Sequence, residues 1–173
     1  ICSEAKEHEF TTVCVNPARL LLAHHHLLDS NVKVCAVIGY PFGTSEPEIK
    51  AHEAELAIDL GAQELDVVMN LGRLKDGDDR GVLRELRDVV EVADGLPIKV
   101  VVESSRLSLG DRARAASISI ESGARFIVTG TGYGDTNASE VRAWREVIGN
   151  AIGRSEEQTS ELQSRLHLVC RLL

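Results

Sequence analysis

Residues 64–70 form the segment that decides the fold, Glu64-Leu65-Asp66-Val67-Val68-Met69-Asn70. The segment is short, almost continuously apolar and rich in valine, which is typical of a strand buried on both faces of a parallel sheet. Four similar segments follow a fairly even spacing along the chain, at residues 12–15, 32–38, 98–102 and 126–129. We therefore expect about five parallel strands.

Longer amphipathic segments separate these strands and predict helices. For the helix after residue 45, we expect a buried stripe made of Ile49, Leu56, Ala57 and Leu60. Ser45 and Glu48 have the spacing of a capping box at its start. The alternation predicts an α/β fold with a parallel sheet, either an open doubly wound sheet or an arc of an eight-stranded barrel.

The composition narrows the classes of function. The 173 residues include 19 Lys+Arg and 27 Asp+Glu, a net charge of −8, which argues against nucleic acid or an anionic membrane surface as the main partner. No apolar run approaches the roughly 20 residues of a membrane span. The four cysteines form no C-x-x-C pair, so we expect reduced thiols in a cytoplasmic protein.

The two ends of the chain differ from its middle. The pattern from Ile1 to Glu7 is that of a helix interior, so we expect further sequence upstream. From Arg154 onward the chain is polar, and we interpret residues 154–173 as a C-terminal tail unrelated to the rest, produced by read-through. The expected organisation is one domain, residues 1–153, followed by this tail.

Asp66 is the first candidate functional residue, because it lies inside an otherwise apolar strand. Burying an unpaired carboxylate costs free energy, so Asp66 should be paired, have a shifted pKa or take part in chemistry. Strand alternation places Asp66, Val68 and Asn70 on one face. A structural ion pair and a catalytic role are equally compatible with the sequence.

Two more candidates follow the next strands. Glu103 lies at the carboxyl end of its strand, where parallel α/β folds hold their sites, whereas Lys99 lies at the other end and is expected to be structural. The turn Thr129-Gly130-Thr131-Gly132-Tyr133-Gly134 could bring backbone N–H groups to a phosphate, although most such turns serve chain geometry only.

The histidines and cysteines predict no metal site. His24, His25 and His26 are adjacent on a predicted helix and point in different directions, so they do not converge on one ion. Cys14 and Cys35 lie in predicted strands, where a small buried hydrophobic role is the default.

Five segments, in order along the chain, together resemble deoxyribose-phosphate aldolase. They are Val13-Cys14-Val15-Asn16-Pro17, residues 33–43 with Gly39-Tyr40-Pro41-Phe42-Gly43, residues 64–72, Lys99-Val100-Val101-Val102-Glu103, and residues 122–133 with Thr129-Gly130-Thr131-Gly132-Tyr133. The resemblance covers roughly residues 1–149. It rests on several linked motifs rather than on a single one.

The resemblance implies a (β/α)₈ TIM barrel, here incomplete with about five strands, and a class I aldolase that uses no metal or other cofactor. It implies reversible cleavage of 2-deoxy-D-ribose 5-phosphate to acetaldehyde and D-glyceraldehyde 3-phosphate through a lysine Schiff base, in deoxyribonucleotide catabolism. By the match, Asp66 assists proton transfer. Residues expected near the substrate are Cys14, Asn70, Glu103, Thr129, Thr131 and Gly132. The expected partner is a small sugar phosphate, with a homo-oligomer as a further option.

Val128 departs from the family pattern. It occupies the position of the Schiff-base lysine, and residues 125–135 contain no lysine. A valine side chain cannot form an imine, so we expect little or no aldolase activity. The family's first strand and last two strand–helix units, with a second active-site lysine, have no counterpart here. We therefore expect an incomplete barrel with two open sheet edges that favour association with other chains.

Two alternatives stay open. A non-catalytic descendant would bind a sugar phosphate or a protein partner and form no imine that borohydride can trap. A different sugar-phosphate barrel enzyme would convert another substrate, and Asp66→Asn would abolish that turnover.

Overall fold

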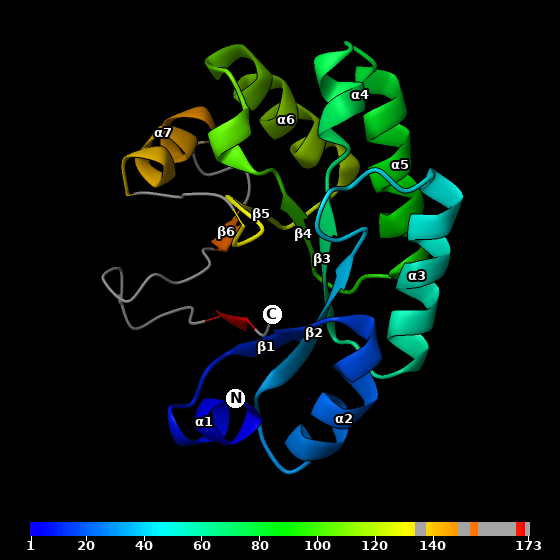
Figure 1. Cartoon of the computed structure of the whole chain (residues 1–173), viewed down its shortest axis with the longest axis vertical. Coiled ribbons are helices and arrows are strands. Elements are labelled where there is room, and N and C mark those ends of the chain that lie inside the picture. Colours follow the sequence, from blue (N-terminus) through cyan, green and yellow to red (C-terminus); the bar gives the residue numbers. More distant parts are fainter. Residues whose placement is uncertain (134–137, 149–152, 156–168, 172–173) are drawn as a thin grey trace.

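The computed structural model describes residues 1–133, 138–148, 153–155 and 169–171. Strands and helices alternate along most of this range (Figure 1). The strands are β1 (Thr12–Val15), β2 (Lys33–Ile38), β3 (Glu64–Val68), β4 (Ile98–Val101), β5 (Phe126–Val128), β6 (Gly153–Ser155) and β7 (Val169–Arg171). The helices are α1 (Cys2–Glu7), α2 (Pro17–Leu27), α3 (Pro47–Asp59), α4 (Leu71–Lys75), α5 (Asp79–Val92), the 3₁₀ helix η1 (Ser104–Arg106), α6 (Leu109–Ser122) and α7 (Ala138–Ile148). No helix in these ranges is long and apolar enough to cross a membrane.

The strands form one parallel sheet in the order β6-β5-β4-β3-β2-β1-β7. The five predicted strands are confirmed, and each lies beside its neighbour in sequence. Two strands of three residues were not predicted: β6 pairs with β5, and β7 pairs with β1. Both come from the region next to or inside the expected tail. Within the described ranges, each edge of the five-strand sheet is therefore covered by a short added strand.

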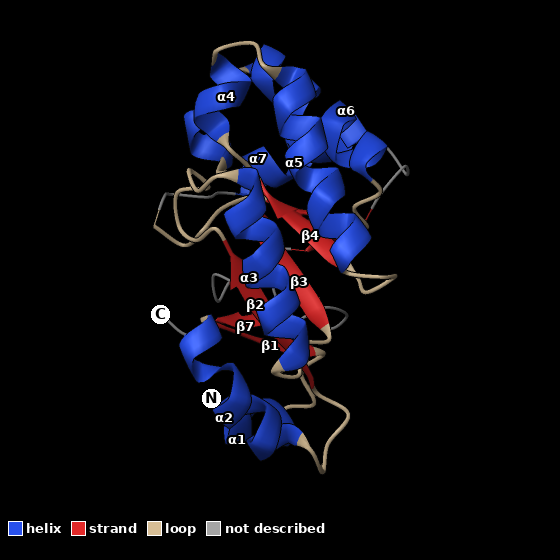
Figure 2. Ribbon diagram, turned by 90° about the vertical axis from the view of Figure 1, so that its right-hand side faces the viewer, coloured by secondary structure: helices blue, strands red, loops and turns tan. Residues whose placement is uncertain are grey.

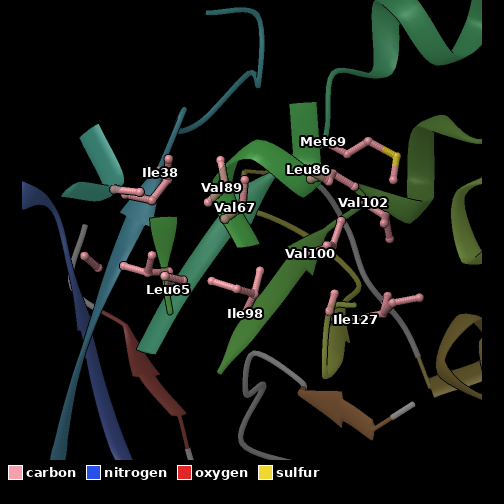
Figure 3. Packing of buried hydrophobic residues seen from close by; sticks show 14 of the residues in the cluster. Ile38, Leu65, Val67, Met69, Leu86, Val89, Ile98, Val100, Val102 and Ile127 are labelled. Carbon is pink, nitrogen blue, oxygen red and sulfur yellow. The ribbon is translucent and has the colours of Figure 1, made fainter. Parts of the chain in front are cut away.

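The two faces of the sheet differ in character. Figures 1 and 2 show helices α3, α5 and α6 packed along one face of the sheet. Alternate strand residues form the apolar layer beneath these helices, including Leu65 and Val67 of β3 and Val100 of β4 (Figure 3). The helices add residues such as Leu86 and Val89 of α5 to the same cluster. The remaining strand residues face the opposite, inner side, and they include the polar ones.

The buried face of α3 differs from the prediction. Ile49 and Leu56 are 60% and 49% exposed, while the buried residues are Lys50, Ala54 and Ala57. Only Ala57 of the expected stripe was correct. The two alanines are small enough to bring the helix close to the sheet, and the Lys50 ammonium finds partners there: the Val68 carbonyl at 2.8 Å and a Glu85 carboxylate oxygen at 2.5 Å.

The predicted capping box at the start of α3 is also wrong. The N-cap is Glu46, and no side chain caps the helix. Pro47 occupies the first helical position, where its fixed φ suits a helix start and its missing N–H costs nothing. The proline therefore sets the start of the helix one residue later than Ser45 would.

Candidate active site

The register of the inner strands brings polar residues from distant parts of the chain together. Cys14 of β1 is paired with Cys35 of β2, and Asp66 of β3 is paired with Lys99 of β4. Asp66 is also paired with Val37 of β2, two residues beyond Cys35. Because these residues point to the same inner side of a curved sheet, their side chains converge. All four polar residues are at most 3% exposed.

Asp66 is an ion-paired carboxylate. Its Oδ1 atom accepts a hydrogen bond from Lys99 Nζ at 2.8 Å, and the same ammonium lies 2.9 Å from Glu64 Oε2. Glu64 in turn accepts a hydrogen bond from Thr12 Oγ1 at 3.2 Å and contacts the half-exposed Lys33 at 3.4 Å. The ion pair that the sequence left as one of two options for Asp66 is therefore present. Lys99, which the sequence placed away from the site, is its partner.

The Lys99 amine is held in its charged form. Burial favours the neutral amine, but attraction to the Asp66 and Glu64 carboxylates outweighs burial and raises the pKa of Lys99. A charged ammonium has no free electron pair and is not a nucleophile. In this state Lys99 can hold Asp66 in place and donate hydrogen bonds, but it cannot attack a carbonyl group.

Two thiols complete the cluster. Cys14 Sγ lies 3.5 Å from Asp66 Oδ2, and Cys35 Sγ lies 3.2 Å from Asp66 Oδ1 and 3.3 Å from Lys99 Nζ. Burial, followed by the hydrogen bond with Cys14 and the charge of Asp66, raises the pKa of the Cys35 thiol. Cys35 is therefore a neutral thiol at neutral pH. The sequence had indicated only a small buried hydrophobic role for both cysteines.

An apolar patch adjoins this cluster on the same side. Val68, Val101 and Val128 pack together, with Tyr40 against them, and Tyr40 also packs against the cluster of Cys14, Cys35 and Val37. Val128 of β5 is the register partner of Val101 and is 3% exposed. Position 128 thus projects into the inner side of the sheet, beside apolar side chains.

Glu103 and Thr131 close the carboxyl end of the sheet. Thr131 donates to Glu103 Oε2 through both its backbone N–H, at 2.9 Å, and its hydroxyl group. One of the backbone N–H groups that the turn could offer to a phosphate is therefore bound by a carboxylate of the chain itself. Tyr40 donates its hydroxyl hydrogen to the Thr131 carbonyl, so the same turn is held from a second side.

A pocket opens beside Glu103 and Thr131. Its lining comprises Pro41, Phe42, Val68, Leu71, Glu103, Arg106, Thr131 and Tyr133. Two of the predicted substrate-side residues, Glu103 and Thr131, line it directly, and Val68 connects it to the patch around Val128. Arg106 supplies a cationic group at its rim.

The remaining predicted residues have other contacts. Asn70 caps helix α4: its side-chain carbonyl oxygen accepts a hydrogen bond from the Arg73 N–H at 3.1 Å. Thr129 is 2% exposed, and its carbonyl accepts a hydrogen bond from the Ser104 N–H. Gly132 has a φ of 86°, a left-handed backbone that favours glycine. Gly134 lies outside the described residues.

Comparison with known proteins identifies the family. The model of the DeoC/LacD family aldolases matches residues 1–152. The chain belongs to this aldolase family. A deoxyribose-phosphate aldolase from Exiguobacterium sibiricum is 45% identical over 156 residues, which cover 88% of this chain and 71% of that protein. The resemblance found in the sequence is thus confirmed.

Solved structures agree with the family and with the barrel fold. The aldolase QR15 has a TM-score of 0.85 at 34% identity, covering 94% of this chain and 72% of that one. The deoxyribose phosphate aldolase of Aeropyrum pernix, described as tetrameric, has a TM-score of 0.82 at 25% identity, covering 94% of this chain and 69% of that one. The α/β architecture is therefore that of the TIM-barrel aldolases.

Sequence reasoning about this aldolase-family chain missed the partners of Asp66. Lys99, Cys35 and Glu64 all contact or adjoin its carboxylate. The available signal was the period of two along adjacent strands: Glu64 and Asp66 share one face, and Lys99 has the same phase on the next strand. The register between strands, which decides whether these residues meet, cannot be obtained from the spacing of residues in one strand.

Proposed function

We propose that the chain carries the site of an aldolase that cleaves 2-deoxy-D-ribose 5-phosphate to acetaldehyde and D-glyceraldehyde 3-phosphate, and that Val128 stops it from forming the lysine Schiff base. Family membership and the relatives named deoxyribose-phosphate aldolase support the reaction class. The pocket beside Glu103, with the cationic Arg106 at its rim, suits a small polar ligand that carries a phosphate.

The position of Val128 is the observation that carries the proposal. The Val128 side chain packs with Val68 and Val101 on the inner side of the sheet, the same face that carries Asp66 and Lys99. A lysine at this position would lie in apolar, desolvated surroundings. Such surroundings lower the pKa of an amine and leave it nucleophilic. Valine offers no electron pair, so the bond to a carbonyl carbon cannot form.

The surrounding residues suit the proton transfers of an aldol reaction. Asp66 is a buried carboxylate oriented by the Lys99 ammonium, and an oriented carboxylate can accept and return a proton. The charged Lys99 is a poor replacement for the missing amine, since its electron pair is bound to a proton. We therefore assign Asp66 to proton transfer and Lys99 to the positioning of Asp66.

The test is restoration of the amine. Val128→Lys and the length-matched control Val128→Met are incubated with acetaldehyde and sodium borohydride, and the adducts are located by peptide mass spectrometry. An imine forms with loss of water, and hydride from borohydride reduces it to an N-ethyl lysine. We expect this adduct at residue 128 of Val128→Lys and no active-site adduct in the original chain or in Val128→Met.

Substrate turnover supplies the second readout. Cleavage of 2-deoxyribose 5-phosphate by the original chain, at a rate equal to that of Val128→Lys, would contradict the proposal. So would an N-ethyl group on Lys99 in the original chain, because it would make Lys99 the Schiff-base residue.

Location, assembly and metabolic role belong to the same proposal. Cys2, Cys14 and Cys35 are free thiols, which favours the cytoplasm as the compartment. The tetrameric relative from Aeropyrum pernix supports a homo-oligomer. Degradation of deoxyribonucleotides is the process that supplies the proposed substrate class. The mass of the purified protein in solution, measured by light scattering, tests the assembly.

A further inference from the structure

Two neighbouring helices expose large apolar side chains to solvent. Leu21 lies in α2 and Leu28 at its end, while Ile49 and Leu56 lie in α3 and Leu60 at its end. These five side chains are between 36% and 64% exposed, and we call them the α2–α3 patch. Soluble monomers rarely expose several such side chains together, so the patch needs an explanation.

The patch is continuous because the two helices touch at its centre. A Cβ atom built on Gly61 would lie 2.7 Å from the His24 ring, so the residue after Leu60 packs directly on α2 (Figures 1 and 2). Leu21 and Leu28 lie three and four residues from His24, which places them on the same side of α2, one turn before and one turn after it. The exposed leucines of both helices therefore lie around one contact point.

We propose that the α2–α3 patch binds a second copy of this chain, with α2 of each copy packed on α3 of the other around a two-fold axis. This surface carries the homo-oligomer proposed above, and its assignment rests on that proposal. It does not depend on the imine chemistry or on any residue of the inner side of the sheet.

The charges of the two helices favour contacts between unlike helices. Helix α2 contains no acidic residue and carries Arg19 and three histidines. Helix α3 exposes Glu48, Glu55 and Asp59 and has no basic residue in its last turn. Packing α3 on α3 of the partner would bring like charges together, whereas packing α2 on α3 avoids this repulsion. A two-fold axis then makes the same favourable contact twice.

The composition of the surface is that of a protein–protein interface. Leucine and isoleucine side chains form its centre, and exposed polar residues adjoin them: His25 follows Leu21 by one helical turn, and Asp59 directly precedes Leu60. An apolar centre with a polar rim is the usual anatomy of such interfaces. In a symmetric dimer each apolar side chain is removed from water twice, so the contribution of each leucine is doubled.

The first test measures the dissociation constant of the full chain by analytical ultracentrifugation. Leu28→Lys and Leu56→Lys each place two ammonium groups in the symmetric interface. We expect either variant to raise the dissociation constant by about 100-fold, that is about tenfold for each copy of the substitution. Leu22→Lys is the matched control: Leu22 is 53% exposed on the same helix, but it lies on the other flank, where it lines a cavity with Cys2. It should leave the dissociation constant unchanged, and circular dichroism checks that all three variants are folded.

Mixing two variants tests the pairing of α2 with α3. One variant carries Leu21→Glu and Leu28→Glu in α2, and the other carries Leu56→Lys and Leu60→Lys in α3. Each alone should be monomeric, because both of its contacts are disrupted. An equimolar mixture should form a heterodimer with one original apolar contact and one contact between glutamate and lysine. Absence of this heterodimer would overturn the proposed arrangement.

Histidine labelling tests the same surface without any variant. Diethyl pyrocarbonate modifies exposed imidazole groups, and mass spectrometry locates the modified residues. We expect slower labelling of His25 at protein concentrations above the dissociation constant than below it. His26 is the internal control, because it lines the cavity on the other flank of α2 and should be labelled equally at both concentrations.

The outcomes separate this surface from the other proposals. An oligomer that survives Leu28→Lys and Leu56→Lys, or equal labelling of His25 at both concentrations, would overturn the α2–α3 surface and leave the homo-oligomer standing. A monomeric original chain would overturn both. None of these measurements detects catalysis, so a failure of the aldolase proposal is distinguishable from a failure of the interface.

Discussion

Lys99 Nζ of β4 lies 2.8 Å from Asp66 Oδ1 of β3, at directly paired positions of two neighbouring strands, and both side chains are almost completely buried. The same ammonium lies 2.9 Å from Glu64 Oε2. One cation thus bridges two carboxylates inside the sheet, and its hydrogen bond to Asp66 fixes the orientation of the proposed proton-transfer residue.

Replacing Lys99 should destabilise the fold strongly. Lys99→Met leaves the buried Asp66 carboxylate without its cation and Glu64 with only the half-exposed Lys33, and removal of one partner from a buried pair costs about 3–5 kcal/mol. Urea unfolding followed by circular dichroism measures the change. The control is Lys33→Met, which removes a half-exposed contact with Glu64 and should cost less than about 1 kcal/mol. Equal losses in the two variants would contradict this account.

The buried pair between Lys50 of α3 and Glu85 of α5 should respond differently to single and double substitution. Burial lowers the pKa of Lys50 and raises that of Glu85, so desolvation opposes both charges. Lys50→Met or Glu85→Leu alone leaves one buried charge and should cost about 3–5 kcal/mol. The double variant removes both charges, and we expect it to recover most of that loss. A double-mutant cycle from urea unfolding gives the coupling, and strictly additive losses would count against it.

The strands and their polar residues differ in how far sequence determines them. Continuous valine-rich runs predicted β1 to β5 to within one or two residues because burial on both faces leaves few alternatives. The short β6 and β7 carry no such run, so nothing in their composition predicted pairing. Asp66 was recognised as a candidate functional residue because burying an unpaired carboxylate in an apolar strand costs free energy.

The buried lysines could not be predicted in the same way. Hydrophobic periodicity predicted that Ile49 and Leu56 lie on the buried face of α3. It did not predict that Lys50 is buried, because the pattern assigns polar residues to the exposed face. Lys50 is buried since a carbonyl of β3 and a carboxylate of α5 satisfy its ammonium. Such partners come from elements far apart in sequence, so only the packed structure reveals them. The same holds for Lys99 and Asp66.

Acid stability should depend on Arg114. Its hydrogen bond is the main cause that lowers the pKa of Asp79. A carboxyl group with a lower pKa in the folded state stabilises the fold above its unfolded pKa of about 3.9, and this contribution is lost as the pH falls through the folded value. In Arg114→Gln the Asp79 pKa should rise towards about 3.9, and the midpoint of acid unfolding should move to higher pH.

Carboxyl chemical shifts in an NMR titration measure the Asp79 pKa, and circular dichroism measures the unfolding midpoint. Ser108→Ala is the control, because Ser108 is the main cause of the lowered pKa of Asp111, three residues from Arg114. It should raise the pKa of Asp111 and leave that of Asp79 unchanged. An unchanged Asp79 pKa in Arg114→Gln would contradict the assignment.

Ser104 should anchor helix α7 to the loop that carries Glu103. Trp144 Nε1 donates a hydrogen bond to Ser104 Oγ at 2.7 Å, and both residues are fully buried. Ser104→Ala removes the acceptor and leaves a buried indole N–H without this partner, which should cost about 1–3 kcal/mol. The adjacent Ser105→Ala is the control, since Ser105 is exposed and its hydroxyl group lies 3.4 Å from Glu103 Oε1. Trp144 is the single tryptophan of the chain, so its fluorescence during urea unfolding reports on this contact directly. If the two alanine variants unfold at the same urea concentration, apolar packing alone holds α7, and the hydrogen bond between Trp144 and Ser104 contributes nothing to the free energy of unfolding.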